Sequence, residues 1–141
     1  MSAIRAFLLV FAWMLQLFHA ALAADMSAPK KHASLFALSS EFEYKVCQIE
    51  VKRNVAMANF MDRPLTHEEL FGCMQRDEEK FDKEYSKLKN EIKRNREALS
   101  ALKEYYAEWK AIMEGDLANQ EPELELDRLR KRQAVLELSF E

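Results

Sequence analysis

Apolar residues recur at heptad spacing through the second half of the chain. From residue 81 to residue 113 the gaps alternate between four and three residues. The positions are Phe81, Tyr85, Leu88, Ile92, Asn95, Leu99, Leu102, Tyr106, Trp109 and Met113. This repeat predicts a coiled-coil-type helical seam. The unbroken phase favours one continuous helix over residues 67–114, about 70 Å long. The alternative breaks the helix near residues 93–96, with Asn95 as a new N-cap.

A shorter heptad pattern predicts an earlier helix over about residues 41–57. Ser40 and Glu43 have the spacing of a capping box, which marks a helix start. Apolar residues then follow at gaps of four, three, seven and four, with Arg53 in the skipped place. They are Phe42, Val46, Ile49, Ala56 and Phe60. We expect this helix to pack beside the start of the next one.

The start of the next helix has the clearest local signal in the chain. Pro64 ends the preceding helix, because the residue before a proline disfavours helical geometry. Thr66 and Glu69 form a second capping-box pair, and Leu65 and Leu70 have the spacing of a hydrophobic staple. A helix beginning at residue 67 is therefore predicted.

A final helix is predicted over about residues 123–139, after Gly115 and a linker at 119–122. Its middle carries a basic run, which consists of Arg128, Arg130, Lys131 and Arg132. Such a run is typical of a solvated helix face; the alternative is a docking patch for an acidic partner.

The first 23 residues have the layout of a secretory signal peptide. Arg5 precedes an apolar run over residues 6–18, and Ala21-Leu22-Ala23 has the small-x-small pattern of a cleavage site. An uncleaved membrane anchor is the alternative. Cleavage leaves a periplasmic or secreted protein that starts at Ala24. We divide it into a flexible leader (24–39) and a single helical domain (40–141).

Composition narrows the fold and the partners. The whole chain has a net charge of −3, and loss of Arg5 leaves 20 basic against 24 acidic residues, or −4. This balance argues against nucleic acid and, after cleavage, against a membrane as the main partner. Only 2 Gly and 3 Pro are present, so the chain has too few turn residues for a multi-stranded sheet.

Two cysteines, Cys47 and Cys73, lie in the exported part and predict one structural disulfide. The fold class is therefore all-α: a disulfide-stapled antiparallel helical hairpin with a long heptad-patterned helix and a C-terminal helix. Cys47 lies farther from the turn than Cys73 does, by roughly 10 Å along a helix. The first helix must therefore end early, near Ala56, or residues 57–65 must fold back as a loop.

The hairpin and the final helix together are too short to cover the whole seam. We therefore expect an uncovered stretch that binds a protein partner or a second copy of the chain. Asn95 would fix the register there, or would instead lie at a kink. The candidate partner surface is Leu88, Ile92, Asn95, Leu99, Leu102, Tyr106, Trp109 and Lys110.

The sequence offers no catalytic, cofactor-binding or metal-binding motif. His32 and His67 have no evident acid or nucleophile partner in the pattern. The carboxylates along residues 68–82 alternate with lysine and arginine, which indicates surface ion pairs. The aromatic cluster of Tyr105, Tyr106 and Trp109 is typical of a core or an interface. We expect a binding protein without a cofactor rather than an enzyme.

Two segments resemble the lysozyme-inhibitor LprI-like family of small secreted proteins. Residues 66–73 read Thr-His-Glu-Glu-Leu-Phe-Gly-Cys, followed by Asp82. A second segment starts at Ala98-Leu99, with aromatic and basic places held by Tyr106, Trp109 and Lys110. The family's Leu-Asn pair is Tyr85-Ser86 here, and its terminal cysteine is absent. The resemblance implies lysozyme binding or an envelope-stress role, with Tyr106, Trp109 and Lys110 on the segment concerned.

Three functions remain open from the sequence. The first is an inhibitor or immunity-type protein that docks on a secreted enzyme. The second is a coiled-coil adaptor or scaffold that assembles through the seam. The third is a periplasmic chaperone that presents apolar surface to unfolded clients.

Overall fold

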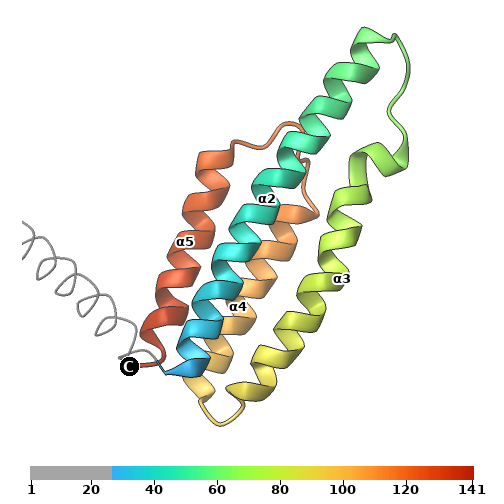
Figure 1. The fold of residues 1–141 in the computed structure, drawn as a ribbon. Helices are drawn as coiled ribbons and strands as arrows, with labels where there is room; N and C mark the ends of the chain where they lie inside the picture. The colour runs from blue at the N-terminus through green and yellow to red at the C-terminus, as the bar shows by residue number, and fades with distance from the viewer. Residues whose placement is uncertain (1–26) are drawn as a thin grey trace, which may run out of the picture.

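A computed structural model describes residues 27–141 and shows four helices and no strand in that range (Figure 1). The helices are α2 (Ala28–Phe60), α3 (His67–Glu91), α4 (Arg96–Met113) and α5 (Pro122–Leu138). They pack as an antiparallel bundle in which α2 lies between α3 and α5, and α4 completes the core. The outer ends of α2 and α3 extend past α4 and α5 (Figure 1). The all-α prediction is confirmed.

The first helix begins much earlier than predicted. α2 starts at Ala28, with Pro29 in its first turn, where a missing N–H costs nothing. Ala33, Phe36 and Ala37 are buried in the core, and this burial holds the segment as helix. The flexible leader is therefore wrong for residues 28–39. The signal-peptide prediction and residues 24–26 lie outside the described residues.

Ser40 is not a helix cap, because it lies in the middle of α2 on the buried side. Its hydroxyl lies 2.5 Å from the hydroxyl of Tyr105, and both are within hydrogen-bond distance of the Ala37 carbonyl oxygen. The indole N–H of Trp109 donates to the Ser40 carbonyl oxygen at 3.3 Å. The small residues of α2 thus let α4 approach closely and receive its polar aromatic groups.

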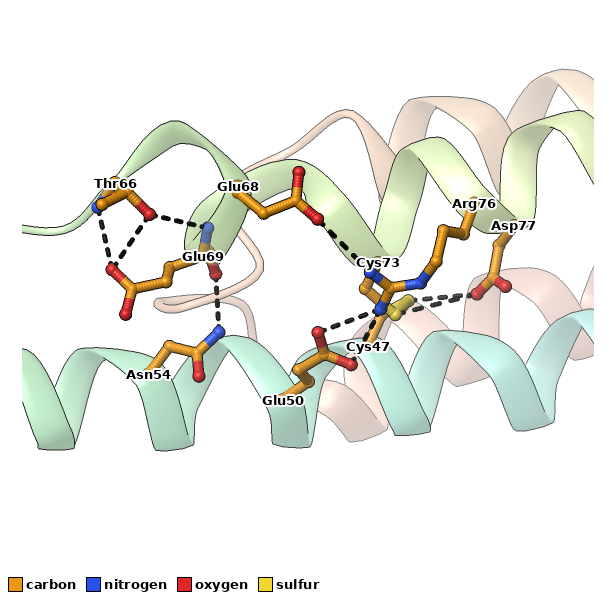
Figure 2. A network of polar contacts seen from close by, with 9 residues as sticks. All are labelled: Cys47, Glu50, Asn54, Thr66, Glu68, Glu69, Cys73, Arg76 and Asp77. Carbon is orange, nitrogen blue, oxygen red and sulfur yellow. Dashed lines mark hydrogen bonds and ion pairs between the residues drawn. A yellow bond between two sulfur atoms is a disulfide. The ribbon is translucent and has the colours of Figure 1, made fainter.

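The predicted hairpin of α2 and α3 is confirmed, with Cys47 and Cys73 at disulfide-bonding distance and their Cα atoms 5.5 Å apart (Figure 2). Farther along the pair, the side-chain amide of Asn54 donates to the Glu69 carbonyl oxygen at 2.9 Å. Both contacts join inward-facing positions of antiparallel helices. The staple therefore fixes which face of α2 is turned toward α3.

The length mismatch is resolved by the connection between the helices. α2 does not end early but runs to Phe60, and residues 61–66 then fold back beside it in non-helical form (Figure 1). Asp62 adopts a positive φ of 49°, and the Arg63 N–H donates to the Ala58 carbonyl oxygen at 3.1 Å. These are the features of a Schellman-type helix end.

The capping box at the start of α3 is confirmed (Figure 2). The Thr66 hydroxyl accepts from the Glu69 N–H at 3.2 Å, and the Glu69 carboxylate accepts from the Thr66 N–H at 3.0 Å. The Arg63 guanidinium also donates to this carboxylate. The hydrogen bonds from Arg63, and then that from the Thr66 backbone, lower the pKa of Glu69 to about 2.

The predicted continuous helix over 67–114 is wrong. α3 ends at Glu91, and α4 begins at Arg96 with Asn95 as its N-cap. The Asn95 side-chain oxygen accepts from the Ala98 N–H at 3.0 Å, and its amide donates to the Ser139 carbonyl oxygen at 3.0 Å. Breaking the helix at Asn95 therefore allows two interactions, the N-cap of α4 and the hydrogen bond to the C-terminal end of α5.

The break folds the heptad seam onto itself. Tyr85 and Tyr106 stack with ring centroids 4.1 Å apart, and Phe81 and Trp109 meet at 4.8 Å. Both pairs are centred on residue 95 or its neighbour, as expected for two halves of one repeat that meet across a turn. The two halves therefore meet through their aromatic residues, and α2 and α5, which pack on α3 and α4, complete the cover of the seam.

Candidate interaction surface

The predicted partner surface on the seam is buried inside the bundle, so the prediction of an exposed seam is wrong. Its residues are buried (Leu88, Ile92, Leu102, Tyr106 and Trp109) or half-buried (Asn95, Leu99 and Lys110). The physical reason is the turn at 92–95, which brings the two halves of the seam together inside the bundle, where α2 and α5 also pack on them. Lys110 forms an ion pair with Glu78, and the Tyr106 hydroxyl donates to Asp82. Burial and the Asp82 contact raise the pKa of Tyr106.

The basic run of α5 is not a free docking patch either. Each of its cations has a carboxylate partner within the bundle. Arg128 pairs with Glu108 and Glu125, Arg130 with Glu41, Lys131 with Asp127, and Arg132 with Glu104 and Glu108. These pairs neutralise the run and join α5 to α2 and α4.

Most of the exposed large apolar side chains within residues 27–141 follow α2 along its solvent side. We define the α2 outer face as Leu35, Leu38, Phe42, Val46, Ile49, Arg53, Ala56, Met57 and Phe60, all of which are exposed. The side chains of Phe42, Ile49 and Phe60 are 64%, 68% and 87% exposed. From Leu35 to Phe60 the face spans about 38 Å of helix at 1.5 Å per residue.

This face contains the same residues that made up the shorter heptad pattern of the sequence. We expected them to pack against the start of α3, but they point away from it. The buried side of α2 is instead built mostly from small and amphipathic residues, with Phe36 and Val51 as its large aliphatic or phenyl side chains. The small and amphipathic residues include Ala33, Ala37, Ser40, Tyr44, Cys47 and Gln48. The heptad stripe is therefore an unused packing surface of a helix that is already packed on its other side.

Basic residues accompany the α2 outer face. Arg53 lies within the stripe, and Lys45 and Lys52, seven residues apart, follow one edge of it. Lys31 precedes the stripe at its N-terminal end. All four are exposed, and among residues 27–141 none of them has a carboxylate within ion-pair distance.

The acidic residues of α2 are all engaged with neighbouring helices. Glu43 pairs with Lys80 at 2.5 Å, and Glu50 pairs with Arg76 at 3.0 Å, both on α3 (Figure 2 shows the second pair). Glu41 faces Arg130 on α5 at 3.4 Å. The exposed side of α2 is thus left with uncompensated positive charge, although the chain as a whole is acidic.

Two grooves border the N-terminal half of the α2 outer face. One, between α2 and α5, has a volume of about 400 Å³ and is lined by Leu38, Glu41, Arg130, Gln133, Ala134 and Glu137. The other, between α2 and α3, has a volume of about 350 Å³ and is lined by His32, Leu35, Phe36, Ser39, Lys80, Phe81 and Glu84. Side chains of a helix laid along α2 would have room in both.

A larger apolar recess of about 560 Å³ lies where the α2–α3 hairpin leaves α4 and α5. It is lined by Val51, Val55, Leu65, Leu70, Phe71, Glu114, Gly115, Asp116, Leu117, Ala118 and Asn119. Leu65 and Leu70, the expected staple pair, both lie on its wall. Its polar lining residues, Glu114, Asp116 and Asn119, all come from the connection between α4 and α5.

The cysteines form a staple with little access to solvent. Cys47 and Cys73 are buried, and the Asp77 carboxylate lies 3.1 Å from the Cys47 sulfur. Burial, and then the negative charge of Glu43, raise the pKa of Asp77. The three residues lie close enough to hold a metal ion, but sulfurs that are bonded to each other supply no thiolate for one.

The two histidines of the described residues make structural contacts. His32 lies 2.8 Å from Glu91 and 3.4 Å from Glu84, and so ties the start of α2 to the end of α3. The His67 ring packs on Phe71 with ring centroids 4.9 Å apart.

Comparison with protein-family models, with curated proteins and with solved structures finds no match to this chain. The resemblance to LprI-like lysozyme inhibitors therefore stays an expectation from two sequence segments. Between residues 27 and 141, none of the helices is both long and apolar enough to cross a membrane.

Proposed function

We propose that this chain is an exported protein that acts by binding another protein, and that the α2 outer face is its docking surface. The observation that carries the proposal is the heptad stripe from Leu35 to Phe60, which is exposed along one continuous helix, α2. Exposed apolar surface of this extent is uncommon on a monomer and is typical of an interaction site. A partner helix laid along α2 would bury it in the manner of a coiled coil.

The adaptor or scaffold function is favoured over the inhibitor function. Of the three residues that the family resemblance singles out, Tyr106 and Trp109 are buried in the aromatic core and cannot contact a partner as they stand, and Lys110 is half-buried and paired with Glu78. The α2 outer face has the length and repeat of a helix-binding surface rather than the single protruding anchor typical of an enzyme inhibitor. Periplasmic or secreted location is part of the proposal, and the buried disulfide supports it.

The test is site-specific photo-crosslinking in the cells that produce the protein. A photoreactive residue at position 46 or 49 should give a covalent adduct of higher mass, whereas one at Lys103, exposed on α4, should not. The double variant F42E/I49E should abolish the adduct formed from position 46. An adduct of twice the chain mass identifies a second copy as the partner. No adduct from α2, or equal adducts from α2 and α4, contradicts the proposal.

A further inference from the structure

The charges beside the α2 outer face point to one class of occupant. Resting on the proposed function, we infer that the partner is an acidic amphipathic helix whose apolar residues pack on the stripe and whose Asp or Glu side chains meet the exposed cations of α2. Those cations are Lys31, Lys45, Lys52 and Arg53.

The first step of the argument is the separation of charges around α2. Its glutamates turn sideways and are neutralised by α3 and α5, whereas its free cations lie on the exposed side. Lys45 and Lys52 are seven residues apart, so they fall at equivalent places beside the stripe, where the flanking charges of a coiled coil meet those of the other helix. A partner with carboxylates at its own flanking positions satisfies both.

The second step concerns Arg53, which occupies an apolar place of the repeat. Its guanidinium has five N–H donors and matches a carboxylate in a two-bond arrangement. A partner helix with Asp or Glu opposite Arg53 gains that pair in the interior of the contact. A partner with a purely apolar seam would bury this charge without compensation.

A second copy of the chain fits this face poorly. In an antiparallel pairing of two outer faces, the edge with Lys45 and Lys52 meets the same edge of the other copy. In a parallel pairing, Arg53 faces Arg53. Like charges in direct opposition are destabilising.

An anionic membrane also fits less well than an acidic helix. The glutamates on the edge opposite the lysines, Glu43 and Glu50, are already paired with α3, but the chain as a whole has a net charge of −3. A bilayer meets a wide area of this acidic protein, whereas a helix contacts only the narrow basic and apolar strip.

The test uses three synthetic helix-forming peptides of 28 residues with the same apolar heptad seam. They carry Glu, Gln or Lys at the positions that flank the seam. Fluorescence anisotropy against the oxidised protein, as processed by the producing cells, should give tightest binding for the Glu peptide, by about tenfold over the Gln peptide. The Lys peptide should bind weakest, and raising NaCl from 50 to 500 mM should remove most of the difference.

Variants of the protein assign the preference to the named cations. The double variant K45E/K52E should reverse the order, so that the Lys peptide binds best. K93E/K103E makes the same charge change at two exposed lysines of the α3–α4 turn and α4, and should leave the order unchanged. Reversal by K93E/K103E as well would mean that net charge alone sets the preference, and would overturn the inference.

The remaining outcomes separate this inference from the proposed function. Equal binding of all three peptides, abolished by F42E/I49E, overturns the acidic class but leaves the docking face in place. Binding to phosphatidylglycerol vesicles without any peptide preference assigns the face to a membrane and overturns the inference. Failure of every peptide also overturns it, and the crosslinks from position 46 then decide the docking face independently.

Discussion

The α2 outer face and the seam of α3 and α4 carry the same heptad spacing of apolar residues, yet the first lies in solvent and the second forms the core. Phe42 on the outer face is 64% exposed, whereas Phe81 on the seam is 1% exposed. The difference arises from the partners available to each stripe. The seam folds back on itself at residues 92–95. The buried side of α2, opposite the outer face, supplies the hydrogen-bond partners of Tyr105 and Trp109 on α4.

This comparison shows that periodicity identifies a packing surface without identifying what covers it. The inward side of α2 has fewer large apolar residues than the outward side, but it offers backbone carbonyls and the Ser40 hydroxyl to Tyr105 and Trp109. Large aromatic groups that carry a polar atom need such partners when they are buried. The side of α2 that is buried is therefore determined by its hydrogen bonds and by how closely it lets α4 approach, and not by which side has more apolar residues.

The largest expected effect on stability comes from replacing the same residue type, phenylalanine, on the seam and on the outer face. Phe81→Ala should lower the free energy of unfolding by about 3–5 kcal/mol, because it leaves a cavity against Trp109 and Phe36. Phe42→Ala should change it by less than about 0.5 kcal/mol, because its ring packs on little in the bundle. Urea denaturation monitored by circular dichroism measures both. Equal losses would mean that the outer face is covered in the protein in solution.

The next effect concerns the staple that fixes the orientation of α2. Replacing both Cys47 and Cys73 with alanine should cost about 3–4 kcal/mol, the chain-entropy value for a loop of this length. Hydrogen exchange should rise most in the part of α2 and α3 that extends past α4 and α5, and least in α4. Uniform acceleration over all helices would show that the staple supports the whole bundle instead of the hairpin.

A smaller effect is expected at the turn that brings the two halves of the seam together. Asn95→Ala removes the N-cap of α4 and the hydrogen bond to the Ser139 carbonyl oxygen, and should cost about 1–2 kcal/mol. Asn95→Asp keeps the capping oxygen but loses the donor to Ser139, so its cost should be intermediate. Thermal unfolding of the three proteins gives the order. A more stable alanine variant would favour the continuous helix that the heptad repeat predicts.

Local signals in the sequence predicted much of the fold. The capping box at Thr66, the final helix and the cysteine pairing were all correct, because each depends on a few neighbouring residues or on one covalent bond. The hairpin followed from the cysteines. The early start of α2 could not be found in this way, since the helix over residues 28–39 depends on burial of Ala33 and Phe36 against distant helices.

The candidate site was harder to predict, because burial is a property of the whole bundle. The heptad patterns predicted an exposed surface on the seam and a packed surface on the α2 stripe, and both predictions were wrong. One signal in the sequence could have indicated the outer face. Lys45 and Lys52 lie seven residues apart beside the stripe with Arg53 inside it, and cations at such places are costly to bury.

A weaker effect is expected at the connection between α2 and α3, where Glu69 accepts hydrogen bonds from Arg63 and Thr66. Because the pKa of Glu69 is lowered to about 2, its carboxylate stabilises the fold above its ordinary pKa, and this contribution is lost as the pH falls toward 2. Carboxyl chemical shifts of Glu69 should therefore show titration below the ordinary range of a glutamate side chain. Glu69→Gln keeps a capping partner for Thr66 but removes the charge, and should make stability less dependent on pH in this window. An ordinary titration of Glu69 would mean that Arg63 does not pair with it in solution.

The smallest change in monomer stability, and the sharpest test of the comparison, is Arg53→Leu. The substitution completes the heptad of the outer face and removes the cation that separates its two apolar halves. Monomer stability should change by less than about 0.5 kcal/mol, because the side chain is exposed and has no carboxylate partner within the described residues. Self-association should nevertheless rise, since a continuous apolar stripe can pair with its own copy once the Arg53–Arg53 opposition is gone. Sedimentation across a concentration series measures this, with Lys103→Leu on α4 as the matched control. If both variants remain monomeric, the outer face lacks the shape to bind a helix; if only Arg53→Leu associates, the two stripes have the same packing capacity and Arg53 is what distinguishes them.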